Sequence, residues 1–482
     1  MSLPKQIKDI LKILEEANFQ AFAVGGCVRD LLLKKEPKDW DIATDAKPKE
    51  VANLFSKTFE INKFGTVTVR TTSKKDNLKE IEITTFRTEE KYSDKRHPDK
   101  VSWAKSLTQD LKRRDFTINA LALDSKGKLI DEFDGQKDLE NKLIRAVGKA
   151  EDRFREDALR LMRAVRFATV LDFKIEKKTL QAIKENANLL RFISKERIRE
   201  ELLKIIMAEK AAEGIELLRE TGLLEHIIPE LLEGYKVSQN KHHIYDVYEH
   251  SLRSLDFGAK KGFNKYVRLA ALLHDIGKPR TKEGKGVEAT FYNHEIVGAK
   301  MTAQILGRLK FPKKDIEKIV KLVRYHLFYY NVDEVGDSSV RRLVRRVGKE
   351  NLKELVQVRM CDRIGSGCPK ALPYKLRHFQ YVAEKVGQDP IDETMLVIGG
   401  KEIMKLLNIK PGPKVGQVLT ILLGEVLEDP KKNKEKYLEA KVKKLKKLKD
   451  KELAKLAKEA ERKRDQIVEK REEMTKKKYW VS

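Results

Sequence analysis

Two aspartates in a short strand-like stretch have the spacing of a metal site. Asp39 and Asp41 stand one residue apart in DWDIAT, a run whose pattern predicts a strand. Residues i and i+2 of a strand project from the same face of a sheet. Two carboxylates so placed can hold a pair of Mg²⁺ ions, one activating an attacking hydroxyl and one bound to a leaving triphosphate. Acidic pairs at this spacing also arise by chance, so other residues must support the site.

A glycine pair and a third carboxylate are candidates for that support. Gly25 and Gly26 follow a strand-like run and precede a helix, so they form either an ordinary tight turn or a place for a phosphate at the helix amino terminus. Arg29, one turn further on, can add a bidentate phosphate contact. Glu82 lies in the strand-like IEITTF, opposite in face to its apolar neighbours. It is either a solvent-facing strand residue or a third metal ligand.

Residues 113–120, RRDFTINA, form a basic and acidic cluster that opens into an apolar run. The cluster is either a solvated turn before a core element or a clamp for a triphosphate and a ribose. Further on, EDALRLMRAVRFAT and KERIREELLKIIMAE carry apolar residues at spacings of three and four, with arginines between them. This pattern predicts amphipathic helices with a basic face.

A second candidate site lies in a helical region that holds six of the nine histidines. His250, His274, Asp275 and Asp362 follow the order His, His-Asp, Asp in DVYEHSLRSL, ALLHDIGKP and RMCDRIG. Such a set supplies the mixed nitrogen and oxygen ligands that suit a divalent transition metal. A lone histidine on an apolar helix is more often structural, so the complete set carries the argument.

The chain is expected to combine an α/β amino-terminal part with helical parts. Strand-like runs alternate with helical stretches before residue 147, and the pattern is almost wholly helical from about Asp152. We therefore predict an α+β fold with a mixed-sheet head. The five expected regions are a head at 1–147, a helical region at 148–235, a histidine-rich domain at 236–375, a helical region at 376–430 and a basic Lys/Glu-rich helical tail at 431–482.

Composition favours a polyanionic partner, either nucleic acid or an anionic membrane surface. Lys and Arg number 102 against 75 Asp and Glu, a formal net charge of +27. Three cysteines are too few for a disulfide framework and fit a reducing compartment. The first residues lack the pattern of a signal peptide, and no apolar run approaches 18 residues, so we expect a cytoplasmic protein with no membrane partner. The tail is expected as one helix, either solvated or a basic arm on RNA.

Taken together and in order, the motifs GGxVRD, DxD, EITTFR, RRDFTINA, FDGxxDL, EDxxRxxRAxRFA and ERIREE resemble the class II tRNA nucleotidyltransferase (CCA-adding enzyme) and bacterial poly(A) polymerase family. That family has a polymerase-β-like head. The resemblance implies that Asp39, Asp41 and Glu82 bind Mg²⁺. It further assigns Gly25, Gly26 and Arg29 to the phosphate-binding turn, and Arg114 and Asn119 to the ribose and triphosphate.

The same resemblance implies that residues 148–235 select the nucleotide and bind RNA, and that the EDxxR helix acts as a protein template for the base. Asp157 and Arg160, expected one helical turn apart, would accept from and donate to cytosine and adenine alone. Arg163 and Arg166 continue that face at i+3 steps and would meet phosphates, unless they belong to a solvated face. The polar stretch 88–113 resembles the family's flexible loop. Enzymes of the family that add the terminal A retain this loop and CC-only enzymes shorten it, so its full length argues against a CC-only enzyme.

HDIGKP resembles the HD phosphohydrolase superfamily, which implies a metal at His250, His274, Asp275 and Asp362. His294 and His326 stand where two-metal HD proteins place further ligands. The domain would hydrolyse phosphate esters, including 2′,3′-cyclic ends of RNA, or would serve mainly to grip tRNA.

The resulting hypothesis is an enzyme that adds CCA, or its terminal A, to tRNA from CTP and ATP, with the oligomeric state left open. A poly(A) polymerase and an HD phosphohydrolase with an RNA-binding head remain as alternatives.

Overall fold

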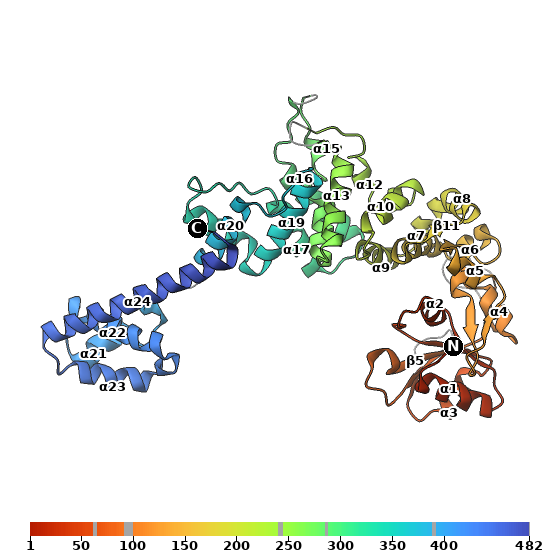
Figure 1. Cartoon of the computed structure of the whole chain (residues 1–482), viewed down its shortest axis with the longest axis horizontal. Helices are drawn as coiled ribbons and strands as arrows, with labels where there is room; N and C mark the ends of the chain where they lie inside the picture. Colours follow the sequence, from red (N-terminus) through yellow and green to blue (C-terminus); the bar gives the residue numbers. More distant parts are fainter. Residues whose placement is uncertain (61–64, 91–99, 240–243, 285–287, 388–391, 482) are drawn as a thin grey trace. The chain divides into compact units, whose positions relative to one another are not determined.

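The computed structural model describes residues 1–60, 65–90, 100–239, 244–284, 288–387 and 392–481, and Figure 1 draws the chain. The chain divides into two compact units. The first contains residues 1–327 and 357–371, and the second contains residues 328–356 and 372–482. None of the described helices is long and apolar enough to cross a membrane.

The head is built on a seven-stranded mixed sheet with the strand order β3-β4-β5-β2-β1-β8-β9 (Figure 1, red to orange). The pair β2 and β5 is parallel, and the other pairs in this sheet are antiparallel. The strands are β1 (Ala21–Val24), β2 (Asp41–Thr44), β3 (Thr58–Glu60), β4 (Thr66–Arg70), β5 (Glu80–Thr85), β8 (Leu121–Leu123) and β9 (Leu129–Asp131), with β6 (Arg87–Glu90) paired to β7 (Lys100–Trp103). The helices are α1 (Lys5–Glu16), α2 (Gly26–Leu32), α3 (Pro48–Leu54), α4 (Leu107–Lys112) and α5 (Gly135–Glu140), with 3₁₀ turns η1 (Asp76–Leu78) and η2 (Thr117–Asn119).

The mixed-sheet head confirms the predicted fold class, and the apolar pattern explains why. On β5, Ile81 and Ile83 alternate with Glu80 and Glu82 and are fully buried. On β2, Ile42 and the two residues after it are buried, and only Asp41 at the start of the strand is not. Trp40, only 2% exposed, separates Asp39 from Asp41, and neither aspartate is buried.

Helices follow the head in the first unit, as predicted. Those before the histidine-rich region are α6 (Ala150–Glu156), α7 (Leu159–Leu171), α8 (Lys177–Asn186), α9 (Lys195–Ile206), α10 (Ala211–Glu220), α11 (Leu224–Ile227) and α12 (Pro229–Leu232), with the 3₁₀ turn η3 (Ala187–Phe192) and a small parallel pair of β10 (Leu143–Ile144) and β11 (Lys174–Ile175). The histidine-rich region contains α13 (Val247–Lys260), α14 (Lys265–Leu273), α15 (Lys278–Thr281), α16 (His294–Arg308), α17 (Lys313–Tyr325) and α19 (Leu352–Gly365).

The prediction of one continuous EDxxR helix is wrong. Asp157 has extended backbone angles (φ −134°, ψ 105°) and separates α6 from α7. Its carboxylate accepts the backbone N–H of Leu159 at 3.0 Å, a local bond that competes with helix continuation. Asp157 therefore lies between the two helices, and Arg160 lies in the first turn of α7, so the two residues do not belong to one continuous helix.

The second unit is helical in the described residues and has its own apolar core. Its helices are α18 (Asp337–Val347), α20 (Tyr374–Val386), α21 (Gly400–Leu407), α22 (Pro413–Glu428), α23 (Glu435–Leu445) and α24 (Asp450–Tyr479), with 3₁₀ turns η5 (Lys349–Asn351), η6 (Glu393–Met395) and η7 (Pro430–Lys432). Figure 1 shows α21, α22 and α23 gathered along the first part of the long helix α24.

The prediction of a single helix in the tail is also wrong. The tail forms the two helices α23 and α24, and both place apolar residues in one core with α21 and α22. Leu438, Val442 and Leu453 are completely buried there. The leucines that repeat among the lysines are therefore a packing seam, and only the remaining faces of these helices are solvated.

Candidate active site and metal centre

Three carboxylates cluster where β2 begins. Asp41 pairs directly with Glu82 in the parallel register of β2 and β5. Burial raises the pKa of Asp41 to about 6, and repulsion from the nearby charges of Asp39 and Glu82 adds to the shift while Arg114 opposes it. Like charges held this close are relieved by a divalent cation, so the chemistry of this donor set fits one.

A glycine turn adjoins the carboxylates. Gly25 precedes α2 with φ +79°, a conformation that side-chain-bearing residues rarely adopt. A Cβ at this position would stand 2.7 Å from Nη1 of Arg114, so a larger residue here would collide with that guanidinium. Arg114 is held in turn by Asp110, at 3.2 Å. The predicted residues Gly25, Gly26 and Arg114 thus lie together.

Arg29 and Asn119 complete this side of the site. Nη1 of Arg29 donates to the side-chain oxygen of Asn119 at 2.8 Å, and Asp30 accepts from the other side of the guanidinium. The guanidinium also lies 5.3 Å from the ring centre of Phe167 on α7. The structure therefore brings Arg29, the RRDFTINA motif and α7 into one contact network.

Asp115 fastens α7 to that motif, and sequence reasoning gave it no role. It accepts from Asn119 at 3.2 Å and from Nε of Arg163 at 2.7 Å. Burial alone would disfavour its charge, but Arg163 and Arg160 outweigh burial and lower the pKa of Asp115 to about 2. Arg163 is therefore engaged by a buried carboxylate rather than part of a solvated face.

Arg166 also has an internal partner. Its Nε lies 2.8 Å from the carboxylate of Glu201 on α9, and its guanidinium stacks 3.8 Å from the centre of the Phe167 ring. Burial lowers the pKa of Arg166 to about 10, a value at which it stays charged at neutral pH. The ERIREE motif that contains Glu201 thus serves to position arginines of α7.

The two residues expected to read the base are not paired with each other. Arg160, 9% exposed, donates to Glu156 at 2.7 Å and to the carbonyl of Arg113 at 2.9 Å. Asp157 instead accepts from Arg197 of α9 at 2.7 Å. The sequence analysis gave Arg197 no role, although its place in the ERIREE motif could have marked it as a functional residue. The polar loop expected at 88–113 lies in part, at 91–99, outside the described residues.

The predicted histidines of the second site surround one carboxylate. Oδ2 of Asp275 lies 3.0 Å from Nε2 of His250 and 3.2 Å from Nε2 of His274. Oδ1 of the same carboxylate lies 3.3 Å from Nε2 of His294 and 3.6 Å from Nε2 of His326. Each oxygen of Asp275 therefore faces its own pair of imidazoles, an arrangement that can bridge two metal ions.

The imidazoles are oriented by the backbone. The Nδ1 atoms of His274, His294 and His326 each lie 2.7–2.8 Å from the carbonyl three residues earlier, which fixes Nδ1 as the protonated nitrogen. Nε2 of each ring is then the nitrogen that faces Asp275 and is available to a metal. Second-sphere bonds of this kind are what metal-ligating histidines use.

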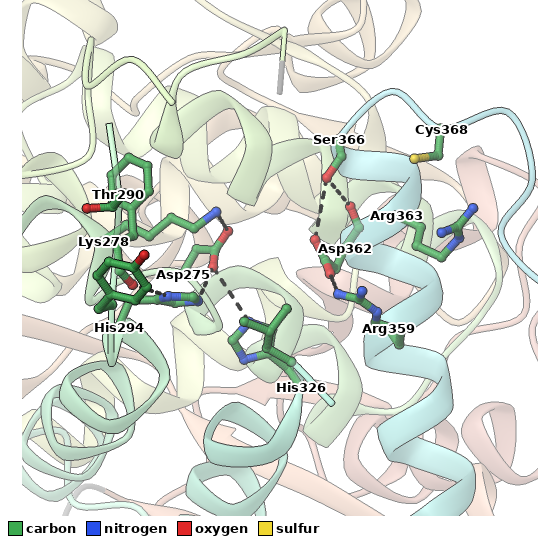
Figure 2. Close-up of a pocket in the computed structure, with 13 residues that line it drawn as sticks. Asp275, Lys278, Thr290, His294, His326, Arg359, Asp362, Arg363, Ser366 and Cys368 are labelled. Carbon is green, nitrogen blue, oxygen red and sulfur yellow. Dashed lines mark hydrogen bonds and ion pairs between the residues drawn. The ribbon is translucent and has the colours of Figure 1, made fainter. Parts of the chain in front are cut away.

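Asp362 completes the first ligand set with His250, His274 and Asp275, while Asp275, His294 and His326 form the second. His274 and Lys278 outweigh burial and hold the pKa of Asp275 well below its usual range, so it is ionised. Figure 2 shows Asp275 between Lys278 and the two histidines of the second set, with Asp362 and Arg359 on α19. These donors fit divalent metals, which head domains and HD domains of these kinds use.

Three family models match successive parts of the chain. The poly A polymerase head domain matches residues 21–145, a probable RNA and SrmB-binding site of polymerase A matches residues 172–234, and the HD domain matches residues 247–366. The first contains the carboxylates and the glycine turn, and the third contains both histidine sets.

Curated relatives match over nearly the whole length. The chain is 35% identical over 460 residues to a CCA-adding enzyme of Ligilactobacillus salivarius, covering 92% of this chain and 99% of that one. It is 34% identical over 441 residues to a CCA-adding enzyme of Lactococcus lactis, covering 91% and 97%. The crystal structure of the Bacillus stearothermophilus CCA-adding enzyme in complex with CTP is 30% identical, covers 92% of this chain and 97% of that chain, and superposes with a TM-score of 0.60. The chain therefore belongs to the family of class II CCA-adding enzymes and is a nucleotidyltransferase.

Proposed function

We propose that this protein adds C, C and A to the 3′ end of tRNA from CTP and ATP, without a nucleic-acid template. The observation that carries the proposal is the cluster of Asp39, Asp41 and Glu82 beside the Gly25 turn and Arg114. Full-length similarity to CCA-adding enzymes supports it, one of them solved with CTP. We place the activity in the cytoplasm.

Asp39, Asp41 and Glu82 are proposed to hold Mg²⁺. Bound there, the metal would lower the pKa of the tRNA 3′-hydroxyl and neutralise the departing pyrophosphate. In the reaction the 3′-oxygen forms a bond to the α-phosphorus of the nucleotide while the bond to the bridging oxygen of pyrophosphate breaks. The chain supplies positioning and charge, so it needs no covalent nucleophile.

The triphosphate is proposed to lie over Gly25 and Gly26, with Arg29 and Arg114 on its oxygens and Asn119 on the ribose side. Arg29 and Arg114 already border the turn, and each has a carboxylate partner, Asp30 and Asp110. Those ion pairs hold the guanidiniums in place before the nucleotide arrives, which reduces the entropy lost on binding.

Base choice is proposed to depend on Asp157 and Arg160. An aspartate accepts from the exocyclic amino group of cytosine or adenine, and an arginine donates to the neighbouring ring nitrogen or carbonyl. Uracil and guanine present the reverse pattern. Arg197 and Glu156 hold the two side chains at the junction of α6 and α7, which supports this role.

The excess of positive charge supports tRNA as the polymer that is extended, since phosphate contacts dominate the affinity of proteins for nucleic acids. We propose that the helical regions bind the acceptor end by shape and backbone charge rather than by sequence. Arg163 and Arg166 are already paired with Asp115 and Glu201, so each would bind a phosphate only while it also contacts its carboxylate partner.

One assay separates full CCA addition from its alternatives. The protein is incubated with Mg²⁺ and tRNA transcripts that end at the discriminator base, at C or at CC, with CTP and ATP supplied separately and together. We expect each transcript to be completed to CCA and then to stop. Extension of the CC-ended transcript alone would indicate an A-adding enzyme, and a long A ladder would indicate a poly(A) polymerase.

We propose a second activity for the HD domain, the metal-dependent hydrolysis of phosphate esters. The observation that favours it is the pair of ligand sets that share Asp275, four of whose residues, Asp275, His294, His326 and Asp362, line a cavity of about 590 Å³. In the reaction a water oxygen bonds to phosphorus, the ester bond breaks and the leaving oxygen takes up a proton. Release of phosphate from a 3′-phosphorylated RNA end, or opening of a 2′,3′-cyclic end to a monophosphate, lost in Asp275→Asn, tests it.

A further inference from the structure

The cavity of the HD domain is lined by residues of different chemistry. Asp275, His294, His326 and Asp362 are candidate metal ligands. The lining also includes two large side chains that are exposed to solvent, Tyr292 at 73% and Leu327 at 51%. Apolar and aromatic side chains beside a few polar groups are the lining that ligand sites have.

These apolar residues are fixed relative to the metal ligands by the chain itself. Leu327 directly follows His326. Tyr292 precedes His294 by two residues, and the carbonyl of Phe291 lies 2.8 Å from Nδ1 of His294. Phe291 is itself nearly buried, with the Lys278 ammonium 5.6 Å from its ring centre. The segment that carries Tyr292 is therefore anchored to the metal site at a defined distance.

A cationic group completes the cavity. Arg359 lines it from α19 and pairs with Asp362 at 2.5 Å, as Figure 2 shows. A guanidinium has five N–H donors in a planar fork, so the pairing with Asp362 leaves it able to meet phosphate oxygens. Lys278 lies at the other side of the metal ligands, 2.7 Å from Asp275.

We infer that the cavity binds the terminal nucleotide of an RNA 3′ end as a unit. Its phosphate lies between the metal ligands and Arg359, and its base lies on Tyr292 and Leu327. Tyr292 is thus the specificity-determining residue that distinguishes a nucleotide from other phosphate esters. Aromatic platforms bind bases of any sequence because every base has a π-face. This inference rests on the proposed phosphohydrolase function and deepens it.

The test compares two short RNAs that both end in a 3′-phosphate, one with uracil on the terminal ribose and one with an abasic terminal ribose. Hydrolysis is measured with the full chain and Mn²⁺, Co²⁺ or Ni²⁺, in the wild type, Tyr292→Ala and Tyr292→Phe. Tyr329→Ala is the matched control, because Tyr329 is 72% exposed but belongs to the second unit and not to this cavity. Nucleotide addition to tRNA reports that every variant is folded.

We expect the wild type to cleave the uracil end with a kcat/KM roughly 10-fold higher than the abasic end, as base stacking on an aromatic ring provides. Tyr292→Ala should lose this preference by slowing only on the uracil end, while Tyr292→Phe and Tyr329→Ala should keep it. Equal rates on both ends in the wild type, or a preference that survives in Tyr292→Ala, would overturn the inference and leave hydrolysis itself intact.

Absence of cleavage of both ends would instead overturn the proposed hydrolysis. Binding of uridine 3′-monophosphate, measured by calorimetry, then decides the inference, because the nucleotidyl-transfer site is proposed to reject uracil. An affinity roughly 10-fold weaker in Tyr292→Ala than in Tyr329→Ala would sustain it. Equal affinity in the two variants would refute it.

Discussion

Asp41 and Glu82 stand directly opposite each other on the parallel strands β2 and β5, although 40 residues separate them in the chain. The parallel pairing fixes both carboxylates on one side of the sheet, since Ile42 and Ile83, the next pair in the register, are buried on the other. A rigid sheet thus sets the spacing of the proposed metal ligands.

Removing one of these carboxylates should abolish nucleotide addition without unfolding the head. We expect Glu82→Gln to lower incorporation of CMP and AMP by at least about 100-fold, because the metal loses a charged ligand. The melting temperature should not fall, since repulsion within the cluster is relieved. Glu80→Gln is the control, because Glu80 is on the same strand but pairs with Arg70. Full activity of Glu82→Gln would refute the assignment.

The contact between Asp157 and Arg197 should govern base selection. We expect Arg197→Met to free the Asp157 carboxylate, lower kcat/KM for CTP and ATP about 10-fold and admit UTP or GTP, because the acceptor is no longer oriented. Steady-state kinetics with each of the four nucleotides measure this, on transcripts that end at the discriminator base or at C for CTP and on a CC-ended transcript for ATP. Arg191→Met, at an exposed position of η3, should leave selection unchanged. Equal kinetics in the two variants would separate Arg197 from base choice.

Because of Asp115, the free energy of unfolding of the head should depend on pH in the acidic range. Its pKa is about 2 in the fold against 3.8 normally, so the stabilisation is complete above about pH 4 and is lost as the pH falls toward 2. That shift corresponds to about 2 kcal/mol. Asp115→Asn should therefore lose the most stability, relative to wild type, near neutral pH and the least near pH 2. Chemical unfolding at several pH values measures it, and a pH-independent difference would contradict it.

The sequence predicted most of the head because its strands carry local alternation. The strand-like run before Gly25 forms β1 (Ala21–Val24), and DWDIAT forms β2 from its second aspartate. The ordered motifs also placed Gly25, Arg29 and Asn119 in one region, and the structure brings them into contact. Local pattern suffices where one face of an element is buried.

Contacts between distant elements were the part that the sequence did not reveal. The pairing of Asp115 with Arg163 and of Asp157 with Arg197 joins residues about 40 or more positions apart, and no local period encodes such pairs. The break at Asp157 was hidden for another reason. A single side-chain bond to the N–H of Leu159 ends α6, although the residues around it favour a helix.

The two histidine sets should bind two divalent ions per chain. We expect the wild type, dialysed against Mn²⁺ with excess Mg²⁺, to retain two equivalents and His326→Ala to retain one, because only the second set is broken. His378→Ala, a histidine of the second unit, should retain two. Elemental analysis measures the metal, and nucleotide addition should persist in each variant. Two equivalents in His326→Ala would exclude its role as a ligand.

The tail should behave as part of a folded core rather than as a solvated arm. Leu453 of α24 is completely buried against the core of the second unit, whereas Leu456, three residues on, is 38% exposed. We expect Leu453→Ala to destabilise this unit by about 2 to 5 kcal/mol, the cost of a cavity in a packed core. Leu456→Ala should cost less than about 0.5 kcal/mol, as surface substitutions do.

Hydrogen exchange read by mass spectrometry over α22 and α24 isolates this effect from the rest of the chain. Faster exchange in both helices for Leu453→Ala, and not for Leu456→Ala, would show that they open together. Similar exchange in the two variants would mean that α24 is held only by its charges. If α24 is packed in this core, RNA binding is affected as well. Lys455 and Lys458, which are exposed on α24, would then have fixed positions on a folded helix. A fixed basic face loses less entropy on meeting a phosphate backbone than a free arm does.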